Sequence, residues 1–130
     1  MALKVDSAVK LNNGVEMPLL GLGVFRAKSG DEAQNAVLWA LEKGYRHIDT
    51  AKAYDNEQDV GISVRNSGIA RESIFITTKL WNDDHGYDKT LKAFDKSLNT
   101  LGMDYVDLYL IHWPLPEKRA ETWEAMERIY

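Results

Sequence analysis

Apolar residues recur along this chain in two kinds of pattern. Some recur with a period of about 3.6 residues, which is typical of helices, and others form short β-branched runs, which are typical of strands. Helical spacing predicts four helices: residues 31–43, residues 57–66, the stripe of Leu91, Phe94, Leu98 and Leu101, and residues 121–130. Strand-like runs precede them at residues 19–25, 45–50, 73–80 and 105–112. A strand and a helix that alternate four times predict a parallel sheet with right-handed crossovers.

The first 25 residues are expected to form a β-hairpin and then a buried strand. Residues 9–17 alternate on both sides of Asn13 and Gly14, a pair that suits the positive φ angles of a type I′ turn. Glycines within residues 19–25 indicate that another group approaches the backbone closely. Gly21 and Gly23 also suggest a dinucleotide fingerprint, but Arg26 stands where its third glycine would fall, so we favour the strand.

Residues that favour helix ends frame two of the predicted helices. Residues 29–31 offer candidate caps for the first helix, which Gly44 is expected to end. The second helix is expected to end at Gly68, and Gly61 weakens it because glycine is a poor helix former.

Length and composition restrict the class of protein. A chain of 130 residues, 45% of them hydrophobic, predicts one folded domain with a real core. A net charge of −4 lacks the basic excess that binding to nucleic acid requires. No cysteine is present for disulfides or thiolate zinc sites, and no apolar stretch has the length of a signal peptide core or a membrane span. We therefore expect a cytoplasmic enzyme or binding domain.

Four chemically active side chains follow the ends of the predicted strands. The carboxyl ends of parallel strands lie at one edge, so Asp49, Lys79 and His112 should meet there, with Tyr54 in the loop after Asp49. Strand parity agrees, since residues 75, 77 and 79 share one face, as do residues 106, 108, 110 and 112. A buried ion pair with two unrelated polar residues is the structural alternative. The convergence of all four favours chemistry.

Together these side chains suit a proton donor with a tuned pKa. Tyrosine titrates near 10, and a neighbouring ammonium such as that of Lys79 lowers this pKa by favouring the phenolate. Asp49 would hold Lys79 charged, and His112 would donate a hydrogen bond to a carbonyl oxygen. Such a site suits reactions that build negative charge on oxygen, the plainest being hydride addition to an aldehyde or ketone.

Other kinds of site find less support. Neither a Gly-x-Ser-x-Gly elbow nor a Gly-x-x-x-x-Gly-Lys loop is present, which argues against hydrolase and phosphate-cradle interpretations. Asp83, Asp84 and His85 are crowded into a polar loop, which is more typical of a solvated turn than of a metal site, so no metal is expected.

Three segments resemble the aldo-keto reductases: residues 44–51 followed by Tyr54, residues 76–81, and residues 107–114. The short connection after residue 114 is similar to that of short-loop bacterial and protozoan members that resemble glyoxal, diketogluconate and prostaglandin F reductases. The resemblance implies an α/β fold, a parallel (β/α)₈ barrel of the TIM type plugged by the hairpin. Residues 1–130 would form a single domain, its N-terminal half with the first four units.

The resemblance also implies an NADPH-dependent reductase that acts on a small carbonyl substrate such as an aldehyde, ketoaldehyde or quinone. By motif position, Tyr54 would be the general acid, Lys79 and Asp49 would tune it, and His112 would orient the carbonyl.

The resemblance further assigns binding roles. Gly23 and Val24, with Asp49, would lie beside the nicotinamide. The substrate pocket would be walled by three aromatic residues, alongside Tyr54 and His112: Phe25, Trp81 and Trp113. Phe25 is a departure, because family members often carry Trp there.

Length is the main departure from the family. In the family, most residues that grip NADPH lie in four further units that this sequence does not contain. A half-barrel would have open edges at its first and fourth strands, which invite self-association or pairing with a complementary half-barrel. The alternative is a catalytically incompetent fragment, or a binding or regulatory module of the same fold.

Overall fold

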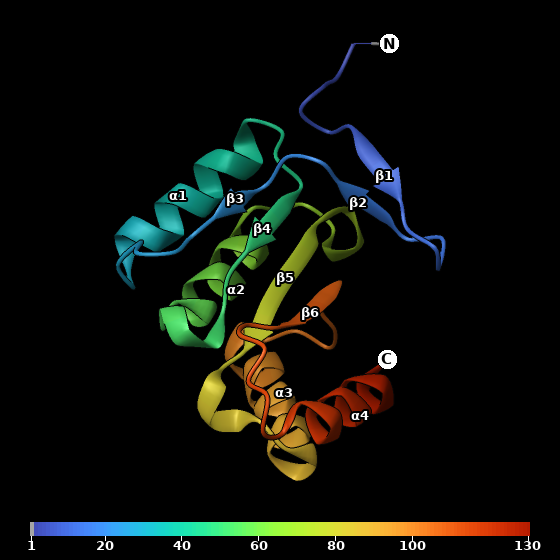
Figure 1. Cartoon of the computed structure of the whole chain (residues 1–130). Coiled ribbons are helices and arrows are strands. Elements are labelled where there is room, and N and C mark those ends of the chain that lie inside the picture. Colours follow the sequence, from blue (N-terminus) through green and yellow to red (C-terminus); the bar gives the residue numbers. More distant parts are fainter. Residues whose placement is uncertain (1) are drawn as a thin grey trace.

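The structure is a computed structural model that describes residues 2–130. A hairpin is followed by four strand–helix units (Figure 1). The strands are β1 (Ala8–Lys10), β2 (Glu16–Pro18), β3 (Leu22–Gly23), β4 (His47–Asp49), β5 (Phe75–Leu80) and β6 (Leu108–Ile111). The helices are α1 (Asp31–Glu42), α2 (Glu57–Asn66), α3 (Tyr87–Leu101) and α4 (Arg119–Ile129). Short 3₁₀ turns are η1 (Lys52–Tyr54), η2 (Arg71–Ser73) and η3 (Asn82–Asp84).

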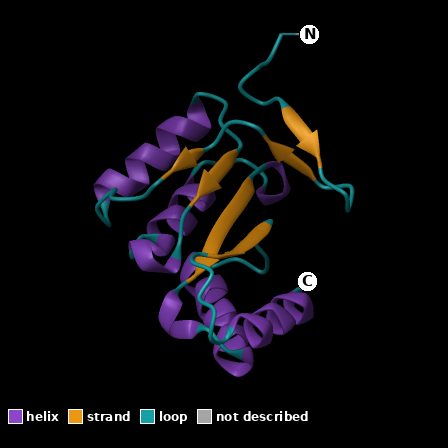
Figure 2. Cartoon of the chain, in the orientation of Figure 1, coloured by secondary structure: helices purple, strands orange, loops and turns teal. Residues whose placement is uncertain are grey.

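The main sheet is parallel and its strands follow the order of the sequence, β3-β4-β5-β6. Successive helices pack on one another, α1 on α2, α2 on α3 and α3 on α4, and Figure 2 shows α1, α2 and α3 along one side of the sheet. A strand order without reversal and helices on one side are features of a barrel wall rather than of a doubly wound sheet. The predicted parallel sheet is confirmed.

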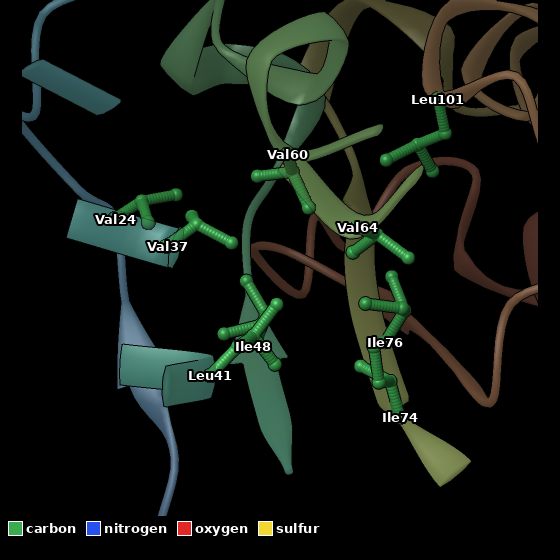
Figure 3. Packing of buried hydrophobic residues seen from close by; sticks show 9 residues of the cluster. All are labelled: Val24, Val37, Leu41, Ile48, Val60, Val64, Ile74, Ile76 and Leu101. Atoms are coloured by element: carbon green, nitrogen blue, oxygen red, sulfur yellow. The ribbon is translucent and has the colours of Figure 1, made fainter. Parts of the chain in front are cut away.

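The hydrophobic core lies between this sheet and the first helices (Figure 3). The predicted stripe of α1 buries Ala33, Val37, Ala40 and Leu41. Ile48, Ile74 and Ile76 meet it from the outer face of the strands. This packing forces the alternate residues of β4 and β5 to the inner face, which is where Asp49 and Lys79 lie.

The N-terminal region departs from expectation in two respects. Only Gly14 of the predicted type I′ pair has a positive φ angle, because the turn spans residues 11–15 and the Asn13 side chain accepts a hydrogen bond from the Val15 N–H. The predicted strand 19–25 shrinks to the two residues of β3, and Leu19, Leu20 and Phe25 are exposed. Close approach is confirmed at Gly21, where a Cβ would lie 3.0 Å from His47.

The expected cap of α1 within residues 29–31 is confirmed only in its position. Gly30 is the N-cap residue, and no side chain of residues 29–31 caps the helix. Asp59 of α2 instead accepts hydrogen bonds from the Gly30 N–H at 3.0 Å and the Ser29 hydroxyl at 2.7 Å. The start of α1 is therefore fixed by a neighbouring helix.

The two outer strands of the main sheet, β3 and β6, each pair on one side only. A groove of about 880 Å³ lies beside β6 and is also lined by residues of the hairpin turn and of α4. It is lined largely by apolar side chains, including Val15, Leu108, Met126 and Ile129. Within residues 2–130, no helix is long and apolar enough to cross a membrane.

Candidate active site

Asp49 and Lys79 meet where β4 and β5 end. The strands are in parallel register with Asp49 opposite Thr77, so Lys79, two residues further, lies on the same face beyond it. Lys79 Nζ is 2.7 Å from Asp49 Oδ2 and 2.8 Å from the carbonyl oxygen of Thr50. The Lys79 ammonium is largely buried. It is held by two oxygens, one from the Asp49 carboxylate at the end of β4 and one from the Thr50 backbone just after it.

Tyr54 reaches the same ammonium from the loop after β4. The turn η1 carries it, and Asp55 then adopts a left-handed conformation before α2 begins. The phenol oxygen is 3.4 Å from Lys79 Nζ, and the Tyr54 ring lies 4.9 Å from that atom. Asp49, Lys79 and Tyr54 therefore form one connected group, as the shared strand ends and the position of Tyr54 in the loop after Asp49 predicted.

His112 completes an aromatic cluster around Tyr54. It lies just beyond β6, and its ring meets Tyr54 edge-on at 5.6 Å and Trp81 at 5.3 Å between centroids. The Trp113 ring is parallel to the His112 ring at 6.1 Å between centroids, and the Phe25 ring lies 5.1 Å from the Tyr54 ring by the same measure. The structure thus brings together all four residues of the predicted proton-transfer set.

A cavity of about 500 Å³ opens on this cluster, a size typical of small-molecule sites. The predicted pocket residues Phe25, Tyr54, Trp81, His112 and Trp113 all line it. Two of these walls are open to solvent, with Phe25 63% and Trp113 56% exposed. The aromatic pocket is therefore assembled on one side and open on the other.

The electrostatics of His112 suit a neutral hydrogen-bond donor. Burial, together with the Lys79 ammonium, lowers the pKa of His112 below its ordinary 6.5, although Asp49 opposes this shift. Its Nδ1 atom is buried and has no hydrogen-bond partner among the described residues. At neutral pH the ring therefore carries a single N–H, which can donate a hydrogen bond to a bound oxygen.

The residues expected beside a nicotinamide fit that role unequally. Gly23 is exposed, and a Cβ at this position would meet nothing closer than Asp49 Oδ2 at 3.9 Å, so a planar ring has room to approach the backbone there. The Val24 side chain is buried in the core. Its N–H donates to the Asp49 carbonyl and its own carbonyl accepts from Asn56. Val24 would therefore offer a nicotinamide only van der Waals contact, because its backbone N–H and carbonyl already have hydrogen-bond partners.

Sequence reasoning missed several residues that shape the site. Lys52, Ala53 and Asp55 also line the cavity, and Lys52 lies 3.8 Å from Asp84 of the loop after β5. The sequence held one sign that these three residues line the site, their position next to Tyr54. Asn56 was also missed as a residue that shapes the site, although asparagine is a favoured residue at the start of a helix.

The acidic loop after β5 is only partly the expected solvated turn. Asp83 is exposed, but His85 is buried and neither of its ring nitrogens has a hydrogen-bond partner among the described residues. Burial lowers the pKa of His85, against the influence of Asp84. Across residues 2–130, no group of three histidine or acidic side chains is arranged to hold a metal ion.

Known proteins share much of this sequence. Residues 19–130 match the sequence profile of the Aldo/keto reductase family. The chain is 56% identical over 124 residues to a 9,11-endoperoxide prostaglandin H2 reductase of Trypanosoma cruzi, covering 95% of this chain and 44% of that protein. It is 55% identical over 130 residues to a glyoxal reductase of Bacillus subtilis, covering 100% and 47%.

Solved structures likewise match this chain over about half of their own length. An aldo/keto reductase from Brucella melitensis superposes with a TM-score of 0.90 at 58% identity, covering 95% of this chain and 48% of that one. A Bombyx mori aldo-keto reductase in complex with NADP gives a TM-score of 0.87 at 41% identity, covering 98% and 47%. The chain spans about half the length of these relatives. The expected partial barrel is thereby confirmed.

Proposed function

Because this chain belongs to the aldo/keto reductase family, we propose that it carries the proton-transfer half of an NADPH-dependent carbonyl reductase. The observation that carries the proposal is the position of Lys79 Nζ, 2.7 Å from Asp49 and 3.4 Å from the Tyr54 phenol at the edge of an aromatic cavity. Relatives named glyoxal reductase and methylglyoxal reductase favour small aldehydes and ketoaldehydes as substrates.

In the proposed reaction, Tyr54 donates its phenol proton to the substrate oxygen as negative charge develops there. Lys79 stabilises the resulting phenolate, and Asp49 keeps Lys79 charged and in place. The N–H of His112 orients the carbonyl by a hydrogen bond. NADPH, when bound beside Gly23 and Asp49, would supply the hydride.

The test follows NADPH binding through the fluorescence of Trp81 and Trp113, alongside reduction of an aldehyde. We expect saturable binding, and we expect Tyr54→Phe to abolish reduction while binding persists. Tyr45→Phe is the control, because Tyr45 lines neither cavity. Reduction at the unmodified rate by Tyr54→Phe would overturn the assignment of the acid.

The short span of the chain favours a second candidate function, that of a binding module that cannot turn over by itself. It covers only 44–48% of the length of the prostaglandin H2 reductase, the glyoxal reductase and a further Bacillus subtilis oxidoreductase, so the cofactor contacts made by the rest of a barrel are not part of this chain. Absence of NADPH binding, with the fold intact, would select this function.

We also infer that, when this chain is by itself, the free edge of β6 pairs with a second copy, in the place that a strand from the other half of a barrel would take. The groove beside β6 is largely apolar and includes the exposed Trp123, and Leu110 of β6 itself is also exposed. An open strand edge beside an apolar groove favours strand addition. Sedimentation should show association that Leu110→Lys weakens, whereas Leu3→Lys, at an exposed N-terminal leucine, should not. A monomer at high concentration would contradict the inference.

A further inference from the structure

Asn56 joins the two turns that carry Phe25 and Tyr54. Its side chain is fully buried, and Nδ2 donates to the carbonyl oxygens of Val24 at 2.9 Å and Ala27 at 3.1 Å. Its Oδ1 accepts a hydrogen bond from the Thr50 hydroxyl at 2.8 Å. The amide therefore uses both of its N–H donors on the turn after β3 and its acceptor on the end of β4.

Both turns have an unfavourable backbone conformation next to these bonds. Arg26, with φ 65°, lies between the two residues whose carbonyls Asn56 binds, and Asp55, with φ 54°, directly precedes Asn56. No other non-glycine residue in the described range 2–130 has a positive φ angle. Such conformations persist only where surrounding contacts fix them, and they gather at functional sites. The Asn56 amide provides such contacts at the turn after β3, and Asn56 itself directly follows Asp55 of the other turn.

A role in capping α2 does not account for this side chain. The backbone carbonyl of Asn56 accepts hydrogen bonds from the N–H groups of Asp59 and Val60, as expected at a helix start. The side chain makes no capping bond to its own helix. All of its hydrogen bonds reach the turn after β3 and the end of β4 instead.

The two turns bear directly on the cavity. Phe25 precedes Arg26 and Tyr54 precedes Asp55, and their rings lie 5.1 Å apart at its wall. Thr50, whose hydroxyl Asn56 binds, also accepts the Lys79 ammonium on its carbonyl oxygen. One buried amide is thus connected to the cavity wall, to the loop of the phenol and to the lysine.

We propose that Asn56 is a positioning residue that sets the spacing between Phe25 and Tyr54, and with it the width of the carbonyl-binding cavity. It acts through Val24, Ala27 and Thr50 and touches neither substrate nor cofactor. Its effect on turnover rests on the proposed function, whereas its effect on the spacing of the rings does not.

The first test is structural and needs no ligand. Asn56→Asp keeps the shape and the acceptor for Thr50 but replaces both donors, so two carbonyls then face a carboxylate. We expect NMR cross-peaks between the Phe25 and Tyr54 rings to weaken and the backbone amides of residues 24–27 to shift. Ser63→Ala is the matched control, because it removes one buried bond from α2, to the Gln34 carbonyl, without a link to either turn. Unchanged ring contacts in folded Asn56→Asp would overturn the proposal.

A milder variant covers the case in which Asn56→Asp does not fold. Thr50→Val is nearly isosteric and releases only the Asn56 Oδ1 atom, so the same ring contacts should weaken to a smaller extent. Ring contacts and amide shifts identical to the unmodified chain in Thr50→Val, with Asn56→Asp unfolded, would count against the proposal.

Turnover distinguishes positioning from a general loss of structure. We expect Asn56→Asp to lose about tenfold more kcat/KM for an aromatic aldehyde, which would fill more of the cavity that the two rings line, than for glyoxal. Equal losses for the two substrates would contradict a role in setting the cavity width. If the unmodified chain reduces neither aldehyde, the proposed function fails, and the ring contacts still decide the role of Asn56.

Discussion

Gly61 of α2 lies directly against the carbonyl oxygen of Leu101 at the end of α3, so closely that a Cβ at residue 61 would overlap that oxygen. The sequence marks Gly61 only as a weak point in a helix. The structure shows why glycine stands there, since it lets two neighbouring helices approach at the level of the backbone. Arg65, one turn further along α2, donates a hydrogen bond to the same Leu101 carbonyl at 2.9 Å.

Gly61→Ala should therefore destabilise the fold, although alanine is more favourable than glycine inside a helix by about 1 kcal/mol. Overlap with backbone atoms cannot be relieved by a side-chain rotation, so α2 and α3 must separate, at a net cost of about 1–3 kcal/mol. Urea unfolding measures this change. Gln58→Ala, at an exposed position of the same helix, should stay within about 0.5 kcal/mol. A Gly61→Ala variant as stable as the parent would contradict the helix contact.

Asp59→Ala should loosen the start of α1. Burial alone would raise the pKa of Asp59, but hydrogen bonds from Gln34, Ser29 and Gly30 outweigh it and lower the pKa below its ordinary 3.8. Removing a carboxylate that accepts these bonds should cost about 2 kcal/mol or more at neutral pH. Because the folded-state pKa is lowered, this contribution exists above pH 3.8 and is lost as the pH falls through the folded value.

Chemical denaturation of Asp59→Ala and of the parent at several pH values checks both statements. The difference in stability should be largest near neutral pH and should shrink below pH 3.8. Asp31→Ala is the control, because Asp31 is an exposed acidic residue in the first turn of α1 and accepts no cross-helix bond. A difference that does not change with pH would show that the hydrogen bonds do not depend on the charge of Asp59.

Periodicity in the sequence was sufficient to bring Asp49 and Lys79 together. A period of two fixes which face of a parallel strand each residue occupies, and the carboxyl ends of such strands lie at one edge. The helix over 57–66 could also be predicted, because its pattern and both of its ends are local. These features depend on neighbours in the sequence, which is why the sequence alone reveals them.

Contacts between distant segments could not be predicted in the same way. Asp59 meets Gly30 across 29 residues and Asn56 meets Val24 across 32. Both side chains look like ordinary helix-start residues, and nothing local says that they serve another element. The predicted strand 19–25 failed for a related reason, because β3 has only β4 as a neighbour in the sheet, and Leu19, Leu20 and Phe25 on either side of it remain exposed.

Glu57 should make the fold less stable as the pH rises. Burial raises the pKa of Glu57 above its ordinary 4.5, although hydrogen bonds from Thr78 and Ser97 oppose this shift. A carboxyl group with a raised folded-state pKa contributes stability below pH 4.5, and this contribution is lost as the pH rises through the folded value.

Glu57→Gln isolates this effect, because the amide is similar in shape and does not titrate. The stability of the parent relative to Glu57→Gln should fall between pH 4.5 and neutral pH, as measured by urea unfolding at each pH. Glu42→Gln, at an exposed end of α1, should show no comparable trend. A parent that gains stability over Glu57→Gln as the pH rises would mean that the hydrogen bonds outweigh burial.

Lys79→Met should raise the pKa of His112. Burial is the first cause of the lowered His112 pKa and the Lys79 ammonium is the second, while Asp49 acts in the opposite direction. Removing the ammonium leaves the Asp49 carboxylate unopposed, and an anion favours the charged imidazolium. NMR titration of the His112 ring should therefore give a pKa below 6.5 in the parent and a higher value in Lys79→Met. Lys89→Met, which removes a charge from the exposed face of α3, should leave the titration unchanged. A His112 pKa that stays the same or falls in Lys79→Met would show that the lysine and the histidine do not share one electrostatic site.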